Sequence, residues 1–107
     1  MRFEVFLDET VVGWTELESG DPPMGVALGR FHPNDAYIGL KPGSTFRVRA
    51  SGGEFLEPSA GVHIADHSAE LGPDAIEICI LGLDAAAYRE HFAAHVQAYE
   101  DHFKRSR

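Results

Sequence analysis

Residues 75–103 read AIEICILGLDAAAYREHFAAHVQAYEDHF, and this stretch decides the fold class. Its first part alternates in a period of two, which predicts a strand with Ile76, Ile78 and Ile80 on its inward face. Asp84 is a good N-cap and starts a helical pattern. The helical spacing places five apolar side chains in one stripe: Tyr88, Phe92, Val96, Tyr99 and Phe103. A strand is therefore followed by an amphipathic helix that needs an apolar surface to pack on.

Upstream of this stretch, period-two alternation recurs between turns rich in Gly, Pro, Asn and Asp. The predicted strands are residues 3–7, 10–17, 25–31, 45–50, 54–57, 61–67 and 75–81. Residues 19–25 are expected to form a loop because two prolines exclude a central strand, and residues 36–40 are either a short strand or one helical turn. Strands first and a helix last predict an α+β fold, in which one long C-terminal helix packs on a curled antiparallel sheet of about six strands.

The chain has 107 residues, which is the size of one domain, so we expect residues 1–107 to form a single α+β domain. A single cysteine excludes an internal disulfide. No apolar run approaches the roughly 18 residues that span a bilayer, and Met1 to Glu4 lack the apolar core of a signal peptide. We therefore expect a cytoplasmic protein that does not enter a membrane.

The net charge of -8 is unevenly distributed. Residues 1–21 hold six acidic side chains against one arginine, and residues 51–83 hold six acidic side chains and no lysine or arginine. Such a surface repels the phosphates of nucleic acids, so we expect no nucleic-acid binding. An acidic surface would attract a basic protein partner. The alternative is that the charge serves only to keep the protein soluble.

Six side chains are candidates for binding a ligand or a protein partner. Trp14 and Met24 flank or belong to the loop around Pro22 and Pro23, whose fixed backbone would lose little entropy on binding. Arg30 and His32 follow this loop in the sequence, and Arg47 and Arg49 face outward from the predicted strand at 45–50. Basic and aromatic side chains of this kind are enriched in protein interfaces. The six candidates are Trp14, Met24, Arg30, His32, Arg47 and Arg49. The alternative for the loop is an ordered turn with Trp14 in the core.

The residues that bear the most chemistry give no catalytic or metal motif. His91 and His95 are four residues apart on the predicted helix, but a zinc site there needs a third ligand, such as Glu77 or Asp66, brought by the fold. Cys79 lies in the middle of a predicted strand, where nothing lowers its pKa. We expect no metal and no cofactor, and the catalytic residues, if any, are unknown.

Two functions remain as hypotheses. The first is a non-catalytic protein-interaction module, either an accessory protein or an inhibitor of a basic partner, with a homodimer expected if one sheet face lacks a helix. The second is a small-molecule enzyme or ligand-binding protein with a pocket between the sheet and the C-terminal helix. It would use Arg47 or Arg49 toward an anionic ligand, and His91 or His95 as acid or base. A concave pocket holding a histidine beside an arginine favours the second hypothesis, and a filled interface favours the first.

Overall fold

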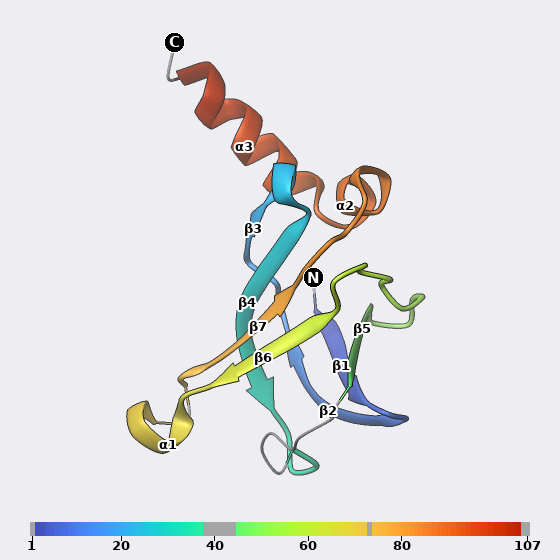
Figure 1. The fold of residues 1–107 in the computed structure, drawn as a ribbon, viewed down its shortest axis with the longest axis vertical. Coiled ribbons are helices and arrows are strands. Elements are labelled where there is room, and N and C mark those ends of the chain that lie inside the picture. The colour runs from blue at the N-terminus through green and yellow to red at the C-terminus, as the bar shows by residue number, and fades with distance from the viewer. Residues whose placement is uncertain (1, 38–44, 73, 106–107) are drawn as a thin grey trace.

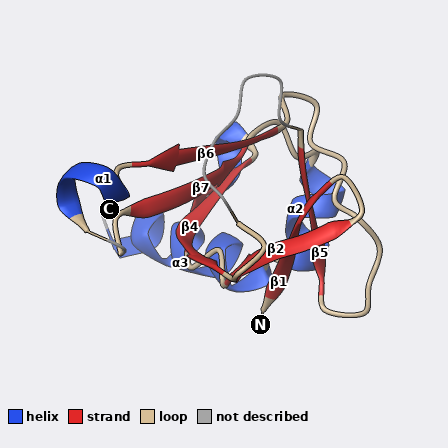
Figure 2. Ribbon diagram, turned by 90° about the horizontal axis from the view of Figure 1, so that it is seen from below, coloured by secondary structure: helices blue, strands red, loops and turns tan. Residues whose placement is uncertain are grey.

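The structure is a computed structural model that describes residues 2–37, 45–72 and 74–105, with side chains up to His102. Its described strands are β1 (Phe3–Leu7), β2 (Thr10–Thr15), β3 (Ser19–Asp21), β4 (Val26–Pro33), β5 (Phe46–Ala50), β6 (Val62–Asp66) and β7 (Ile76–Ile80). Its described helices are the 3-10 helix η1 (Pro22–Met24), α1 (Ser68–Leu71), α2 (Ala85–His91) and α3 (Ala93–Arg105). The strands form one sheet that curls into a half-barrel, and α2 and α3 lie at one end of it (Figures 1 and 2).

The sheet has the order β5-β1-β2-β4-β7-β6, every pair of neighbours is antiparallel, and β3 pairs with β4 beside this path. The expected curled antiparallel sheet with a C-terminal helix is therefore confirmed. Its strands alternate as the sequence predicts, because Phe46 and Val48 are buried while Arg47 is exposed. In β7 the three isoleucines Ile76, Ile78 and Ile80 are all buried.

The first hairpin turns in two residues although Asp-Glu is a poor turn sequence. Leu7 pairs directly with Thr10, and Asp8 takes a positive φ of 56°. Aspartate tolerates this left-handed conformation better than most residues because its short polar side chain can bond the local backbone. A shift of register between Val5 and Phe6 then adds a bulge, which increases the local twist and helps the sheet to curl.

The core lies inside the half-barrel, and α2 closes it. Phe3 at the start of β1 stacks on Phe92 with ring centroids 5.4 Å apart, and Tyr88 is 2 % exposed. The ring of Phe31 packs against Gly13, where there is no room for a side chain: a Cβ at this position would lie 2.6 Å from the ring. The helical region therefore packs on the sheet through the first part of its predicted apolar stripe.

The structure corrects the helix prediction in one respect: the expected single helix is two helices that meet at Phe92. This residue leaves the helical conformation (φ −129°, ψ 42°), and α3 then runs away from the sheet along η1 (Figure 1). A straight helix could not hold Phe92 against Phe3 and also place α3 beside β3. The change of direction satisfies both contacts.

Two local predictions are also corrected. Residues Ser19–Asp21 form the short strand β3 rather than a loop, since they pair with the start of β4 before the two prolines end the pairing. Residues 54–57 contribute only a single bridge, between Phe55 and Arg49, instead of a strand. Most of the ambiguous segment 36–40 lies outside the described residues, as does the side chain of Phe103. The same holds for residues 41–44, where Pro42 and Gly43 predict one of the turns between strands.

Candidate binding surfaces

Strand register brings four of the six predicted binding residues to one surface of the sheet. Arg49 of β5 lies opposite Glu4 of β1, Glu4 lies opposite Trp14 of β2, and Trp14 lies opposite His32 of β4. Arg47 is two residues from Arg49 and therefore faces the same side. We call this surface, together with Arg2 and Phe55, the arginine face.

Trp14 lies in a stack on this face rather than in the core. Its ring is 4.0 Å from that of His32 with an interplanar angle of 18°, and the guanidinium of Arg2 lies 3.9 Å from the indole centroid. The indole is half-buried under these two neighbours. Sequence reasoning missed Arg2, although its parity with Glu4 in the first strand places both residues on the outward side.

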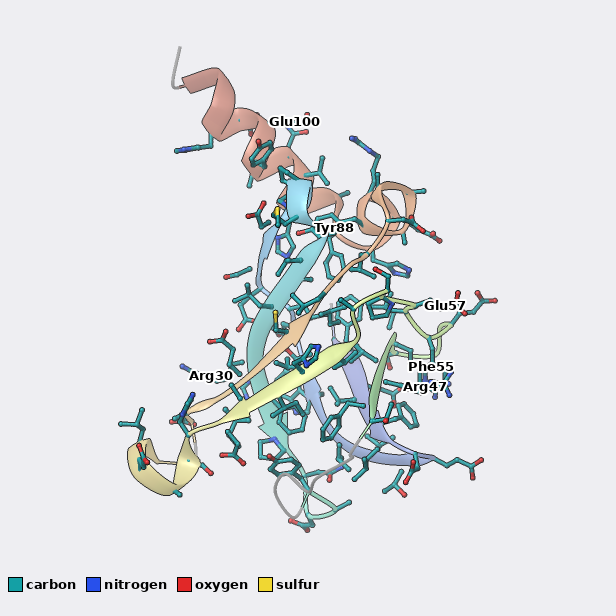
Figure 3. All side chains as sticks on the ribbon, in the orientation of Figure 1. Arg30, Arg47, Phe55, Glu57, Tyr88 and Glu100 are labelled. Carbon is teal, nitrogen blue, oxygen red and sulfur yellow. The ribbon has the colours of Figure 1, made fainter. Side chains whose placement is uncertain are left out.

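A second cluster on the arginine face joins two arginines to two phenylalanines. The guanidinium of Arg47 lies 3.8 Å from the ring of Phe55, and that of Arg49 lies 4.9 Å from Phe6 and 5.4 Å from Phe55. The rings of Phe6 and Phe55 meet edge to face at 5.1 Å. Arg49 also forms an ion pair with Glu4, at 3.2 Å between Nε and Oε1. Figure 3 labels Arg47 and Phe55, which lie together at the β5 side of the molecule.

Met24 lies elsewhere, in η1 directly after the two prolines that line a small apolar groove between η1, α2 and α3. The groove has a volume of about 200 Å³ and is lined by Pro22, Pro23, Ala85, Tyr88, Arg89, Val96, Tyr99 and Glu100. Met24, the last residue of η1, is 69 % exposed, and Tyr99 is 38 % exposed. We call the lining residues together with Met24 the proline groove. Its apolar members on α3 belong to the predicted stripe, whereas its prolines come from the predicted loop.

Two hydrogen bonds fix the helices that line this groove. The hydroxyl of Tyr88 donates to the carbonyl oxygen of Val26 at 2.9 Å, and Nε2 of His95 lies 2.6 Å from the carbonyl oxygen of Leu17. Burial, with a smaller contribution from the nearby Asp21 carboxylate, raises the pKa of Tyr88 to about 12. The groove is therefore built from elements that the core holds in place.

A larger cleft separates α2 from the segment after β5. It has a volume of about 460 Å³ and is lined by Arg47, Glu54, Phe55, Leu56, Glu57, Asp84, Ala87 and His91. Asp84 caps α2 by accepting a hydrogen bond from the amide of Ala87 at 2.8 Å. The cleft holds a histidine and an arginine, as the ligand-binding hypothesis requires. The interface between sheet and helix beneath it is nevertheless filled, by Phe3, Tyr88 and Phe92.

Arg30 lies in a third cavity, of about 360 Å³, between β4, β7 and the segment before β3. Its side chain is on the part of β4 that pairs with β7, opposite Glu77, and its backbone amide donates to the carboxylate of Glu18 at 2.8 Å. Asp74 and His67 also line this cavity. The surroundings of Arg30 are thus acidic, and the aromatic rings that accompany Arg47 and Arg49 are not among the residues that line this cavity.

Cys79 and the histidines His63, His91 and His95 are held in different local surroundings. Burial, with help from Glu77, raises the pKa of the Cys79 thiol, which disfavours the reactive thiolate. His63 lies opposite Cys79, but its Nε2 is 2.7 Å from the carbonyl oxygen of Ala60. His91 faces the large cleft whereas His95 faces Leu17, and no group of three His, Cys, Asp or Glu side chains among the described residues could hold a metal.

None of the helices in the described ranges combines the length and apolar character needed to cross a bilayer. Comparison of the chain with protein-family models, with curated proteins and with solved structures finds no match.

Proposed function

We propose that this chain is a non-catalytic protein-binding module whose partner docks on the proline groove. The observation that carries the proposal is the exposure of Met24, at 69 %, beside a groove that is already formed. A flexible thioether on such a surface adapts to an apolar side chain of a partner. The two prolines of η1 reduce the entropy that the loop would lose when a partner holds it.

The position of α3 supports the same surface. This helix extends beyond the sheet, and its main neighbours are α2, β3 and η1 (Figure 1). Its apolar residues Val96 and Tyr99 lie at the groove, where an apolar side chain of a partner would gain area removed from water. A partner that covers both α3 and η1 would bury the groove between them.

The charges around the groove support a basic partner. Arg89 and Glu100 form an ion pair at 3.9 Å across the rim, so they offset each other. Asp21, whose carboxylate is close enough to Tyr88 to help raise the pKa of that residue, adds a negative charge beside the groove, in a chain whose net charge is -8. Opposite charge on a partner would accelerate association and orient it on the groove. A second copy of this chain would bring the same negative charge, so we propose a different protein, as its accessory factor or inhibitor.

The test compares capture from a lysate of the source organism by three immobilised proteins: the wild type, Met24→Asp and Leu71→Asp. Leu71, at 74 % exposed, is a matched control because it is an equally exposed apolar side chain on α1, away from η1 (Figure 1). We expect a protein that the wild type and Leu71→Asp retain, that Met24→Asp loses, and that elutes as salt rises. The captured protein must then bind in purified form with the same pattern.

The proposal would be contradicted if all three immobilised proteins captured the same proteins. It would also be contradicted if the wild type captured no protein at low salt. Light scattering of the free chain at tens of micromolar tests the separate prediction of a homodimer. A dimer that Met24→Asp converts to a monomer would assign the groove to a second copy instead.

The large cleft favours a second function, the binding of a small ligand between β5 and α2. Its specific support is that Arg47 and His91 both line a cavity of about 460 Å³. Three carboxylates, from Glu54, Glu57 and Asp84, also line it, so a ligand that carries both an anionic and a cationic group fits better than a simple anion. A metabolite screen by thermal shift tests this function: stabilisation should be lost in both Arg47→Gln and His91→Ala and kept in Arg89→Gln.

A further inference from the structure

The proline groove has the size of one side chain of a partner. Its volume is about 200 Å³, whereas a cavity of roughly 150 Å³ is enough to hold a single benzene ring. The groove therefore takes one aromatic ring and no second large side chain. A partner that lay flat across η1 and α3 would leave this space empty, and the walls of an empty apolar space lose their packing contacts.

The walls of the groove favour a flat apolar side chain. Pro22 and Pro23 contribute pyrrolidine rings from η1, and Tyr88 and Tyr99 contribute aromatic rings from α2 and α3. The hydroxyl of Tyr88 already donates its proton to the carbonyl oxygen of Val26, so this donor is used within the protein. An aromatic side chain in the groove would gain contacts between rings in addition to the apolar area removed from water.

The carboxylate of Asp21 is available to a partner beside this groove. Asp21 occupies the N-cap position of η1, directly before the two prolines, but its side chain accepts no capping hydrogen bond. The two prolines that follow it have no backbone N–H to donate to it. Asp21 also has no ion pair among the side chains that the structure describes. Its charge nevertheless reaches the groove, because it helps to raise the pKa of Tyr88.

The other charged groups of the groove offset each other. Arg89 and Glu100 are the charged residues that line it, and they form an ion pair at 3.9 Å. With Asp21 the groove has one positive and two negative groups, so its local charge is negative. Charge complementarity therefore selects a positively charged group next to the aromatic ring of the partner.

We propose that the proline groove binds a short segment of the partner protein, in which one aromatic side chain fills the groove and a neighbouring lysine or arginine pairs with Asp21. The proposal rests on the function proposed above, because it names the part of the partner that the groove holds. It makes a single apolar anchor, rather than a broad apolar patch, the source of most of the affinity.

A synthetic peptide tests this mode of binding without the partner. The probe is acetyl-Gly-Gly-Phe-Lys-Gly-Gly-amide, and two control peptides have alanine in place of phenylalanine or glutamine in place of lysine. NMR shifts of the methyl groups of Ala85 and Val96, which line the groove, measure the affinity. We expect saturable binding of the probe, about tenfold weaker binding of the alanine peptide, and about two- to fivefold weaker binding of the glutamine peptide. Equal affinities for the phenylalanine and alanine peptides would overturn the aromatic anchor.

Two neighbouring alanines provide matched variants that assign the site. Ala85 and Ala86 are both exposed at the start of α2, but only Ala85 is among the residues that line the groove. Ala85→Leu should fill the groove and abolish binding of the probe, whereas Ala86→Leu should leave its affinity unchanged. Asp21→Asn should weaken the lysine peptide by about two- to fivefold and leave the glutamine peptide unchanged. Binding that survives Ala85→Leu would overturn the placement of the ring in the groove.

The peptide and the lysate experiment fail independently. Binding of the probe without any captured protein would contradict the proposed function and support the anchor chemistry of the groove. Capture that Met24→Asp abolishes, together with equal binding of the phenylalanine and alanine peptides, would support the function and overturn the anchor. If both proposals hold, the phenylalanine peptide competes with the captured protein and the alanine peptide does not.

Discussion

Nε2 of His95 lies 2.6 Å from the carbonyl oxygen of Leu17, and this contact joins α3 to the turn between β2 and β3. Leu17 is fully buried and has a positive φ of 46°, which a leucine rarely adopts. The imidazole ring also stacks on Phe92, at 5.5 Å and 7°. His95, a possible metal ligand by sequence, therefore attaches α3 to the sheet. This helix forms one wall of the proline groove.

Removing this imidazole should weaken the attachment of α3. We expect His95→Ala to lower the free energy of unfolding by about 1–2 kcal/mol, because it leaves the carbonyl of Leu17 without its hydrogen bond. Gln97→Ala on the same helix is the control, since Gln97 is exposed and its side-chain amide donates to Asp101 on the same helix rather than to the sheet. Urea unfolding measures both variants. An equal loss in the two would mean that the bond to Leu17 contributes nothing.

Gly20 allows α2 and α3 to approach β3. A Cβ at this position would overlap the hydroxyl of Tyr88 and lie 2.9 Å from the carbonyl oxygen of Val26. Gly20→Ala should therefore destabilise the fold by about 1–3 kcal/mol, the usual effect of overpacking. Gly53→Ala is the comparison, because a Cβ there would meet its nearest atom at 3.3 Å. Thermal unfolding should rank the wild type first, Gly53→Ala second and Gly20→Ala last.

Alkaline pH should lower the free energy of unfolding, because the hydroxyl of Tyr88 ionises. Its pKa is raised to about 12 in the folded chain from an ordinary value of 10, so the unfolded chain ionises first. Stability should be complete below pH 10 and fall as pH rises from 10 toward 12. In Tyr88→Phe this part of the decrease should disappear, which unfolding at pH 9 and pH 11 would measure. Tyr37→Phe is the parallel variant, because burial and Asp66 also raise the pKa of Tyr37.

Asp66 should respond to the loss of one serine hydroxyl. Hydrogen bonds from the side chain of Ser68, from Tyr37 and from the backbone of Ser68 hold the pKa of this carboxyl below its ordinary value of 3.8. Ser68→Ala should raise that pKa toward 3.8, as measured by NMR titration of the side-chain carboxyl carbon. Because the folded pKa is depressed, the stability linked to Asp66 is present above pH 3.8 and lost as pH falls through the folded value. An unchanged titration curve in Ser68→Ala would contradict the assignment.

The candidate surfaces were only partly predictable from the sequence. Alternation alone places Arg47 and Arg49 on the outward side of their strand, and the diproline segment is recognisable as a rigid anchor. The partners of these residues were not predictable, since Phe55 is 8 positions from Arg47 and Trp14 meets Arg2 and His32 only through the register of three strands. Arg30 is only two residues from His32, yet it does not join the arginine face. It lies in an acidic cavity because β7 brings Glu77 beside it.

The sequence by itself determined the inward faces of strands such as β5 and β7 and the helical character of the C-terminal region, because periods of two and of about 3.6 residues follow from backbone geometry. It also determined the acidic surface and the capping of α2 by Asp84. Only the tertiary structure decided the break at Phe92, since the conformation of that residue depends on a ring of β1 more than 80 positions away. It likewise decided which charged and aromatic side chains share a surface, because strand order and register set those distances and no local pattern encodes them.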